Sequence, residues 1–410
     1  MIDRPLYLQR ILSFQNSGLV KVITGMRRSG KSSLLLLYRD WLKNQGIADE
    51  DIIYINFESL ANEEWTDYKK LYEAVTALSK ERKRKVFLLL DEIQNVHSWE
   101  KVINSLRIDI DCDITITGSN AKLLSGELAT YLAGRYIEIQ VYPLSFEEYL
   151  NFRNSRSEQG KIPEYFEEFL KLGGMPGLHE IHGSPTAKYQ YLSDIFDSVL
   201  LKDVITRNNI RDTELLRRII IFLMDNIGSS FSAQTVSNFL KNQGRRLSTE
   251  TVYNYLDFLE NALIIERARR FDLKGKNYLT TQEKIFVTDV GIRNAVLGYK
   301  PKDIAGVLEN VVFLNLRQKG YSVSVGTLGK QEIDFVGEKD GRKQYIQVTY
   351  QLTPDNYERE IAPLKKIKDN YPKILLTMSP DLTGDEEGIQ IQYLPDFLLS
   401  GTITREPAYS

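Results

Sequence analysis

The chain has 410 residues, of which 42% are hydrophobic and 26% charged, and its formal net charge at pH 7 is −2. This length predicts two or three domains, and the near-neutral charge means that any DNA contact has to come from a local basic patch. The single cysteine, Cys112, cannot form a disulfide within the chain, which favours a reducing compartment over a secreted disulfide framework. We find no secretory signal and no run of about 20 apolar residues, so we expect a cytoplasmic protein without membrane contact.

Apolar strands alternate with amphipathic helices from residue 19 to about residue 150. The expected strands lie at 19–24, 51–59, 85–93, 113–119 and 135–144, and the expected helices include 31–45 and 99–107. Strands that alternate with helices predict an α/β fold in which helices cover both faces of a parallel sheet. We therefore assign residues 1–150 to one α/β domain.

A glycine-rich loop, "GMRRSGKSS", joins the first of these strands to the first helix. It matches the phosphate-binding pattern G-x-x-x-x-G-K-[ST], and it has the strand before it and the helix after it that this pattern requires. The two glycines allow successive backbone N–H groups to surround an anion, and the helix start adds its positive dipole end. We expect Lys31 to reach the outer phosphates, Ser32 to bind Mg²⁺, Ser33 to cap or pack, and Arg27 and Arg28 to face outward. The residues predicted to form the nucleotide site are Gly25, Met26, Arg27, Arg28, Ser29, Gly30, Lys31, Ser32 and Ser33.

Two acids end the continuous apolar run "VFLLLDEI". An acid at the carboxyl end of a parallel strand faces the ligand crevice of such a sheet. Asp91 is therefore a candidate ligand for Mg²⁺, directly or through water, and Glu92 is placed to accept a proton from an attacking water. The Asp-Glu pair favours ATP hydrolysis over nucleotide binding alone.

Further polar residues follow the next strand and precede the last one. Thr117, Ser119 or Asn120 can bond the attacking water or the γ-phosphate, while a helix N-cap at Ser119 or Asn120 is an equal alternative. Arg135 can reach a phosphate in its own subunit or in a neighbouring one, as an arginine finger does, or it can form a surface ion pair. We include Asn120 and Arg135 among the candidate catalytic residues, with Lys31 and Glu92.

The pattern changes after residue 145. Ser145 and Glu148 form a capping-box sequence, and helices follow with almost no strand as far as residue 262. We assign 151–210 to a helical lid. Helices at 214–227, 232–243 and 248–262 precede two short strands at 263–272 and 283–291, which predicts a winged helix at 211–300. Residues 301–410 return to an α/β pattern and form the last predicted domain.

Basic residues surround the second half of the predicted winged helix. Its candidate recognition helix, 248–262, carries Glu250, Asp257 and Glu260, which suit DNA poorly. The basic residues nearby can grip phosphates, or they can be a solvated edge strand protected from aggregation. They are Lys241, Arg245, Arg246, Arg267, Arg269, Arg270, Lys274 and Lys276.

Several motifs together resemble those of a known group of proteins: "GMRRSGKSSLL", "LLLDEIQNV", "ITGSNAKLLS", "LAGRYIEIQVYPLSFEEYL", "KLGGMPGL" and "EIDFV". The chain is similar to the predicted AAA+-like ATPases of bacteria and archaea, close to the signalling NTPases with numerous domains. The resemblance implies a P-loop ATPase core, a helical lid, a winged helix and a terminal domain similar to restriction endonucleases. It implies that the nucleotide, the metal and the water are served by Gly30, Lys31, Ser32, Asp91 and Glu92, with Arg135 in the "LAGR" element.

Such nucleases carry four characteristic side chains at their metal site, and the terminal domain differs from them at two of these positions. Glu309 and Asp334 occupy two acid positions, but Gln347 stands at the second strand's acid position and Thr349 at the lysine position. Both changes weaken metal-assisted cleavage, so we expect an inactive domain that serves for binding or packing.

These observations lead to one main interpretation and two alternatives. The main one is a Mg²⁺-dependent ATP-hydrolysing switch that acts on double-stranded DNA through its winged-helix and C-terminal domains. The alternatives are a signalling scaffold that binds a protein partner, and an ATP-gated nuclease. A homo-oligomer is compatible with each of them.

Overall fold

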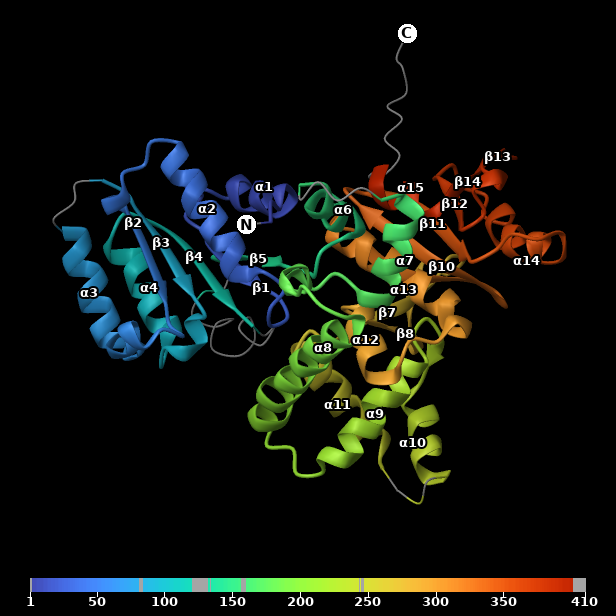
Figure 1. Ribbon diagram of the computed structural model, residues 1–410, viewed down its shortest axis with the longest axis horizontal. Coiled ribbons are helices and arrows are strands. Elements are labelled where there is room, and N and C mark those ends of the chain that lie inside the picture. The colour runs from blue at the N-terminus through green and yellow to red at the C-terminus, as the bar shows by residue number, and fades with distance from the viewer. Residues whose placement is uncertain are drawn as a thin grey trace, which may run out of the picture. The chain divides into compact units, whose positions relative to one another are not determined.

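The computed structural model describes residues 2–80, 84–119, 132, 134–155, 160–242, 244 and 247–400. The chain forms two compact units, which are labelled by element in Figure 1. The first unit comprises residues 1–143 together with 261–263, and the second comprises 144–260 and 264–410.

The first unit is built on a five-stranded parallel sheet with the strand order β2-β3-β4-β1-β5. This confirms the α/β fold and the parallel sheet predicted from the sequence. Its strands are β1 (Val20–Thr24), β2 (Ile52–Asn56), β3 (Val86–Asp91), β4 (Cys112–Gly118) and β5 (Tyr136–Gln140). Its helices are α1 (Pro5–Ser13), α2 (Lys31–Asn44), α3 (Tyr68–Lys80) and α4 (Trp99–Asp109), and the short 3-10 turns are η1 (Asp49–Asp51), η2 (Leu60–Thr66) and η3 (Ile93–Asn95).

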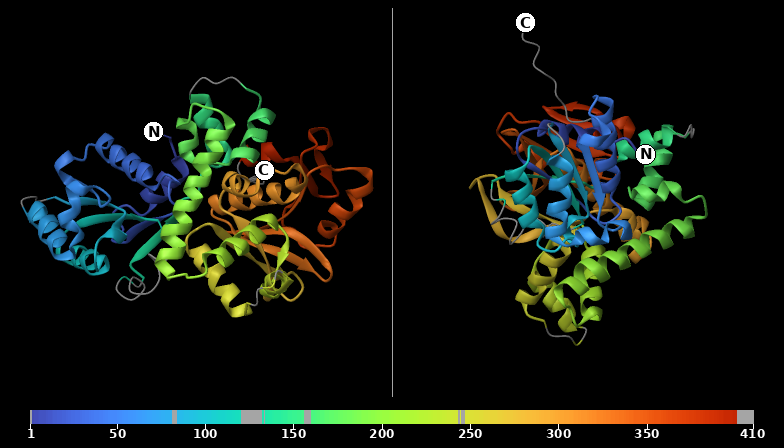
Figure 2. Two further views of the ribbon diagram at one scale, coloured as in Figure 1. Left: turned by 60° about the horizontal axis from the view of Figure 1, so that its bottom comes forward. Right: turned by 90° about the vertical axis from the view of Figure 1, so that its left-hand side faces the viewer.

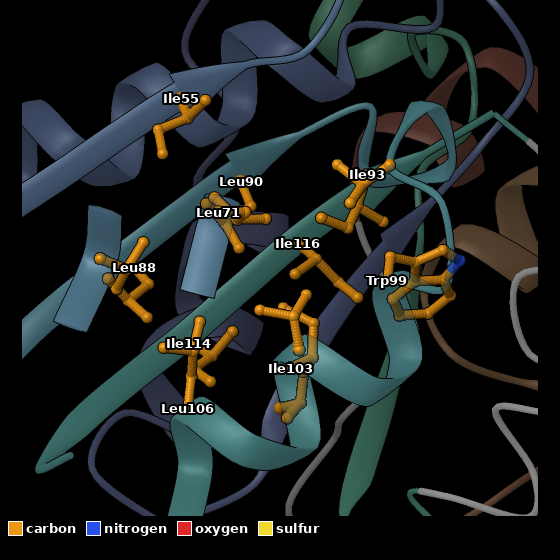
Figure 3. Close-up of a cluster of buried hydrophobic side chains, with 14 of the residues drawn as sticks. Ile55, Leu71, Leu88, Leu90, Ile93, Trp99, Ile103, Leu106, Ile114 and Ile116 are labelled. Carbon is orange, nitrogen blue, oxygen red and sulfur yellow. The ribbon is translucent and has the colours of Figure 1, made fainter. Parts of the chain in front are cut away.

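Two apolar clusters cover the two faces of this sheet. On one face, side chains of β3 and β4 such as Leu88 and Ile116 pack against Leu71 of α3 and Ile103 of α4, as Figure 3 shows. The other cluster joins α1 and α2 to the sheet and contains Tyr7, Ile11, Leu34, Leu35 and Tyr38. All six residues of β3 are buried, which explains its continuous apolar sequence. Because each fully buried large apolar side chain contributes about 1.5–3 kcal/mol, these clusters hold the ends of β1 and β3 in fixed positions.

The second unit begins with helices. The capping box predicted at Ser145 is confirmed, since the Glu148 N–H donates to Ser145 Oγ over 3.1 Å and the Ser145 N–H donates to Glu148 Oε2 over 2.9 Å. Helix α8, in the predicted lid, continues directly as the π-helical turn η6. The helices are α6 (Phe146–Ser155), α7 (Ile162–Leu172), α8 (Pro185–Val199), η6 (Leu200–Thr206), α9 (Thr213–Asp225), α10 (Ala233–Asn242), α11 (Thr249–Asn261), α12 (Val290–Leu297), α13 (Ile304–Gln318), α14 (Pro354–Lys365) and α15 (Leu394–Ser400), with 3-10 turns η5 (Pro176–Glu180), η7 (Pro301–Asp303) and η8 (Pro380–Leu382).

A single nine-stranded sheet runs through the rest of this unit, and its orange strands are visible in the left view of Figure 2. Its order is β13-β14-β12-β11-β10-β9-β7-β8-β6. The strands are β6 (Ser230–Phe231), β7 (Ile265–Asp272), β8 (Asn277–Val287), β9 (Ser322–Leu328), β10 (Gln331–Lys339), β11 (Arg342–Thr349), β12 (Lys373–Thr377), β13 (Gly384–Glu386) and β14 (Ile389–Tyr393). The predicted boundary at residue 300 falls within this sheet, because β7 of the hairpin pairs in parallel with β9. The four-domain division of the chain stays a prediction.

Candidate nucleotide site

The loop between β1 and α2 has a backbone that its glycines make possible. Gly25 has φ +156° and Gly30 has φ +100°, and both values are costly for a residue with a side chain. A Cβ on Gly25 would lie 2.5 Å from the carbonyl oxygen of Val141 and 2.8 Å from Ser29 Oγ, so the loop also lacks room for one. Position 25 therefore requires glycine for two reasons: its backbone angle, and the close approach of Val141, which follows β5.

Helix α2 begins directly after this loop, at Lys31. Its N-cap is Gly30, which has no side chain with which to cap the helix. The N–H groups of a first helical turn have no carbonyl partner within their helix, and the dipole adds partial positive charge there. Such an end is a site for an anion of the size of a phosphate.

Lys31 adds a full positive charge at the same place. Its side chain is 4% exposed, its Nζ donates to the carbonyl oxygen of Met26 over 3.2 Å, and it lies 3.7 Å from Glu92 Oε1. The ammonium is thus held between the loop and the end of β3, so that an incoming phosphate would meet a charge that is already in position.

Asp91 receives hydrogen bonds from three elements. The hydroxyl of Ser32, on α2, donates to Asp91 Oδ1 over 3.1 Å, and that of Thr117, on β4, donates to the same oxygen. Asp91 Oδ2 accepts from Tyr54 Oη over 3.3 Å and from Asn56 Nδ2 over 3.1 Å, both on β2. Burial raises the pKa of the Asp91 carboxyl above its ordinary value, although the hydroxyl donors act in the opposite direction.

Glu92 follows Asp91 in a left-handed conformation, with φ +56°. Its backbone N–H donates to Thr117 Oγ1 over 2.9 Å, so one threonine fixes both acids. The amide of Gln94 bonds Glu92 Oε2, which leaves the other carboxylate oxygen toward Lys31. An acid with a strained backbone that is held by two neighbours is typical of a functional site.

The residues present suit a nucleotide with Mg²⁺. The Ser29 hydroxyl is fully buried beside the loop and has no hydrogen-bond partner among the described residues. Mg²⁺ is usually bound through one or two carboxylates together with phosphate oxygens and water, and Asp91 with the Ser32 hydroxyl provides the protein share of such a set. The described residues contain no group of three or more histidine, cysteine or acidic side chains suited to a metal ion.

The other predicted site residues have different environments. Arg28 and Ser33 are exposed, while Arg27 is half-buried and lies 3.7 Å from Glu58. Arg135 is exposed directly before β5, and its side chain forms no ion pair with a residue that the structure describes. Asn120 lies outside the described residues.

Arg4 is a residue of this site that sequence reasoning missed. Its side chain is 2% exposed, and its Nη1 donates to the carbonyl oxygens of Ser29 over 3.0 Å and Tyr142 over 2.9 Å. The guanidinium lies 4.4 Å from the ring centre of Tyr7, whose hydroxyl accepts from the Tyr142 N–H. Arg4 thus stabilises the phosphate loop from the N-terminal segment. An arginine next to a proline matches no sequence motif, so this role could not be predicted.

The second unit holds a separate polar cluster around Lys284, on β8. Its Nζ lies 2.9 Å from Glu309 Oε2, 2.9 Å from Glu332 Oε1 and 3.2 Å from Asp334 Oδ1. Burial lowers the pKa of this ammonium, but the three carboxylates outweigh burial and raise it. The cluster therefore contains the lysine that the sequence pattern lacked, supplied by another strand. A lysine directly before the buried run "IFV" was the available signal.

The remaining nuclease-like positions lie around this cluster. The Asp334 N–H donates to Gln347 Oε1 over 3.3 Å, and Gln347 Nε2 donates to Glu360 Oε2 over 3.2 Å. The Thr349 hydroxyl donates to the carbonyl oxygen of Gln351 instead of entering the cluster. Glu309, Asp334 and Gln347 are thus close together, and Thr349 has no part in their contacts.

Some of the basic residues predicted near the hairpin have partners within the chain, and others are exposed. Arg267 bonds Asp257 over 2.8 Å and also bonds Glu260, both on α11, so its charge is already neutralised. Arg269 is 4.0 Å from Glu283, and Arg270 bonds the side chain of Gln282. Lys241, Lys274 and Lys276 are exposed, whereas Arg245 and Arg246 lie outside the described residues.

Comparison with known proteins supports the assignment of the first unit. A family model described as an AAA domain matches residues 17–150, and one described as a domain of unknown function (DUF8612) matches residues 163–303. An uncharacterized protein of Haemophilus influenzae is 42% identical over 399 residues, covering 97% of this chain and 99% of that protein. The uncharacterized protein MJ1544 of Methanocaldococcus jannaschii is 35% identical over 372 residues, covering 85% of this chain and 79% of that protein. The chain belongs to their family.

A solved structure agrees with this assignment at the level of the fold. The Walker-type ATPase PABY2304 of Pyrococcus abyssi has a TM-score of 0.50 and 16% identity, covering 72% of this chain and 96% of that chain. This family member is thus a P-loop protein with an AAA-type ATPase domain, as the motifs predicted. The winged helix and the restriction-endonuclease likeness stay predictions. None of the described helices has the length and apolar character needed to cross a bilayer.

Proposed function

We propose that the chain is a Mg²⁺-dependent ATPase that works as a molecular switch. One observation carries the proposal: the Ser32 hydroxyl, at the start of α2, lies 3.1 Å from Asp91 at the end of β3, with Lys31 and Glu92 beside them. Two segments 59 residues apart thus bring together the residues that we propose as the metal-binding pair, the phosphate-binding cation and the general base. ATP is favoured over GTP because the sequence has no N-K-x-D motif for reading guanine.

Each group has a distinct role in this mechanism. The loop N–H groups and Lys31 bind the phosphates and neutralise their charge, and Ser32 and Asp91 would hold the Mg²⁺. The bound ion supplies further charge neutralisation on the phosphate oxygens. Glu92 accepts the proton of the attacking water, and Thr117 and Gln94 hold Glu92 in the orientation that this transfer requires.

The role of Glu92 is tested by Glu92→Gln. This variant keeps the shape of the side chain but cannot take the proton, so ATP binding should persist while turnover falls by about 100-fold or more. Glu64→Gln is a matched control, because Glu64 is exposed on η2. Binding is measured by calorimetry and turnover by phosphate release. Normal turnover in Glu92→Gln would contradict the assignment of the base.

Arg135 is proposed to act on the site of a neighbouring copy in a homo-oligomer. The proposal is supported by its exposure and by the absence of an ion pair with the described residues. Arg135→Ala and Lys31→Ala should each be inactive alone. A mixture of the two should regain activity, because one protomer supplies the arginine and the other the intact loop. A mixture that stays inactive would assign Arg135 to its own subunit.

The second unit is proposed to carry the nucleotide state to DNA, and the protein to act in the cytoplasm. Helices α9, α10 and α11 followed by the β7–β8 hairpin support a winged helix, with α6, α7 and α8 as the lid. The measurement is the ATPase rate with and without double-stranded DNA. A rate that DNA leaves unchanged, with no gel shift at low salt, would favour the signalling scaffold that binds a protein.

An ATP-gated nuclease is the second candidate, and the Lys284 cluster is the observation that bears on it. The lysine restores a group that the sequence pattern lacked, but its three ion pairs occupy the carboxylates that a metal would need. We therefore propose a structural role for the cluster. Cleavage of DNA with Mg²⁺ or Mn²⁺ that is lost in Asp334→Ala would overturn this view.

A further inference from the structure

A cavity of about 1090 Å³ opens at one end of the strands β7, β9, β10 and β11, in the second unit. Four segments line it: the β7–β8 turn, the β9–β10 turn, the start of β11, and the segment after α14. Of the elements next to these segments, β7, β8, β10, β11 and α14 are labelled in Figure 1. Its volume is at the upper limit of the pockets that take small ligands. It belongs to neither the nucleotide site nor the Lys284 cluster.

The cavity is lined by six lysines and one carboxylate. The lysines are Lys274, Lys276, Lys330, Lys343, Lys366 and Lys368, and the carboxylate is Asp369. Lys343 lies 3.6 Å from Glu338 and 4.8 Å from the ring centre of Phe271. The other five lysines are exposed and form no ion pair within the described part of the chain. In a chain whose net charge is −2, this is a strong local concentration of positive charge.

Protection of a sheet edge does not explain these lysines. Natural proteins place lysine on edge strands to prevent pairing with other chains. Here β7, β9, β10 and β11 each have a neighbouring strand on both sides. Ammonium groups that line one cavity repel one another, and an anionic ligand would reduce that repulsion.

Aromatic rings lie among the lysines. Phe271, Tyr345 and Tyr371 line the cavity, and Tyr371 is 38% exposed. Tyr278, which is 53% exposed, packs edge-on against Phe271 with 5.2 Å between the ring centres. Lysines that neutralise phosphates beside aromatic faces that stack bases are the two elements of single-strand recognition, whereas a duplex keeps its base faces stacked on each other.

We propose that this cavity binds single-stranded nucleic acid, with the lysines on the phosphodiester backbone and the exposed rings against unpaired bases. The inference goes beyond the proposed action on double-stranded DNA, because it assigns a further surface of the second unit to unpaired strands. It does not depend on the ATP site. DNA and RNA share the chemistry that the cavity recognises. The two are separated by the experiment.

The test is fluorescence anisotropy of the full-length protein, without ATP, with labelled oligo(dT), oligo(U) and a duplex of the same length over a range of salt concentrations. Lys330→Gln combined with Lys366→Gln should weaken single-strand binding about tenfold. It should also lower the salt slope by about 1.4, because each lysine neutralises one phosphate and each phosphate of a single strand contributes about 0.7 to the slope. Tyr371→Ala should also weaken binding about tenfold but leave the salt slope unchanged, because stacking carries no net charge. The tighter of the two single strands identifies the natural ligand.

The matched control is Lys202→Gln combined with Lys302→Gln, which removes two exposed lysines of the same unit that do not line the cavity. The control should bind within about twofold of the unaltered protein. Equal losses in the cavity and control variants would overturn the proposal. A loss of duplex binding in the cavity variants as large as their loss of single-strand binding would also overturn it. ATP affinity, measured separately on the same variants, should be unchanged. A protein that binds single strands but no ATP would refute the proposed ATPase and leave the cavity assignment intact.

Discussion

Replacing Gly25 by alanine tests the geometry of the phosphate loop. The new Cβ would lie 2.5 Å from the Val141 carbonyl oxygen and 2.8 Å from Ser29 Oγ, on a residue with φ +156°. A backbone angle of this kind costs about 1–3 kcal/mol for a residue with a side chain, and an overpacked methyl group about 1–3 kcal/mol more. The loop relieves this strain only by moving away from its position, so at least about 2 kcal/mol should be lost from nucleotide binding, which is roughly 30-fold in affinity.

The matched control is Gly46→Ala, after the end of α2. Gly46 has φ +84°, but a Cβ there would meet nothing within 4 Å. This variant therefore carries the backbone cost without the steric one and lies outside the site. Titration with a fluorescent ATP analogue should show an affinity within about twofold of the unaltered protein for Gly46→Ala. If Gly25→Ala binds as tightly as the control, the loop does not surround the phosphates as we describe.

Two further predictions concern stability. Arg4→Met leaves two buried carbonyl oxygens, those of Ser29 and Tyr142, without a charged donor, at a cost of about 1–3 kcal/mol each. Urea unfolding followed by tryptophan fluorescence should show the loss, since all three tryptophans lie in the first unit, and an unchanged midpoint would contradict the bracing role. Burial raises the pKa of Asp289 from 3.8 to about 6, so the folded state binds this proton more tightly than the unfolded chain does. The stability from this group is present below about pH 4 and is lost as the pH rises to about 6, by about 3 kcal/mol. Asp289→Asn should abolish that loss, as measured by the protection of the Gly174 N–H from hydrogen exchange. A wild-type protein in which this N–H is equally protected at about pH 4 and about pH 6 would refute the raised pKa of Asp289.

The parts of the fold that were predictable are those whose cause is local. The apolar runs, the glycine-lysine loop and the capping box at Ser145 each depend on residues within a few positions of one another, and the structure confirms the parallel sheet and the capping box. The Asp91–Glu92 pair was also visible, because it ends a buried strand.

The interactions that sequence reasoning missed join distant segments. Arg4 bonds the backbone of residues 25 and 138 positions away, and Lys284 meets carboxylates 25 and 50 positions away. The "KLGGMPGL" motif has a similar explanation: the N–H of Gly174 donates to Asp289, 115 residues later, over 2.8 Å, and a Cβ on Gly173 would lie 2.3 Å from the same carboxylate. No periodicity encodes such pairs, because they arise only when the units have formed.

Calorimetric titration of the protein with ATP, in the presence and absence of Mg²⁺, tests the central claim most directly. The account predicts binding that Mg²⁺ strengthens, and a loss of that binding in Lys31→Ala, since this variant removes the buried ammonium that lies 3.7 Å from Glu92. Binding that is equally tight in Lys31→Ala, or no binding with Mg²⁺ present, would contradict the proposal that this loop and these acids form an ATPase site.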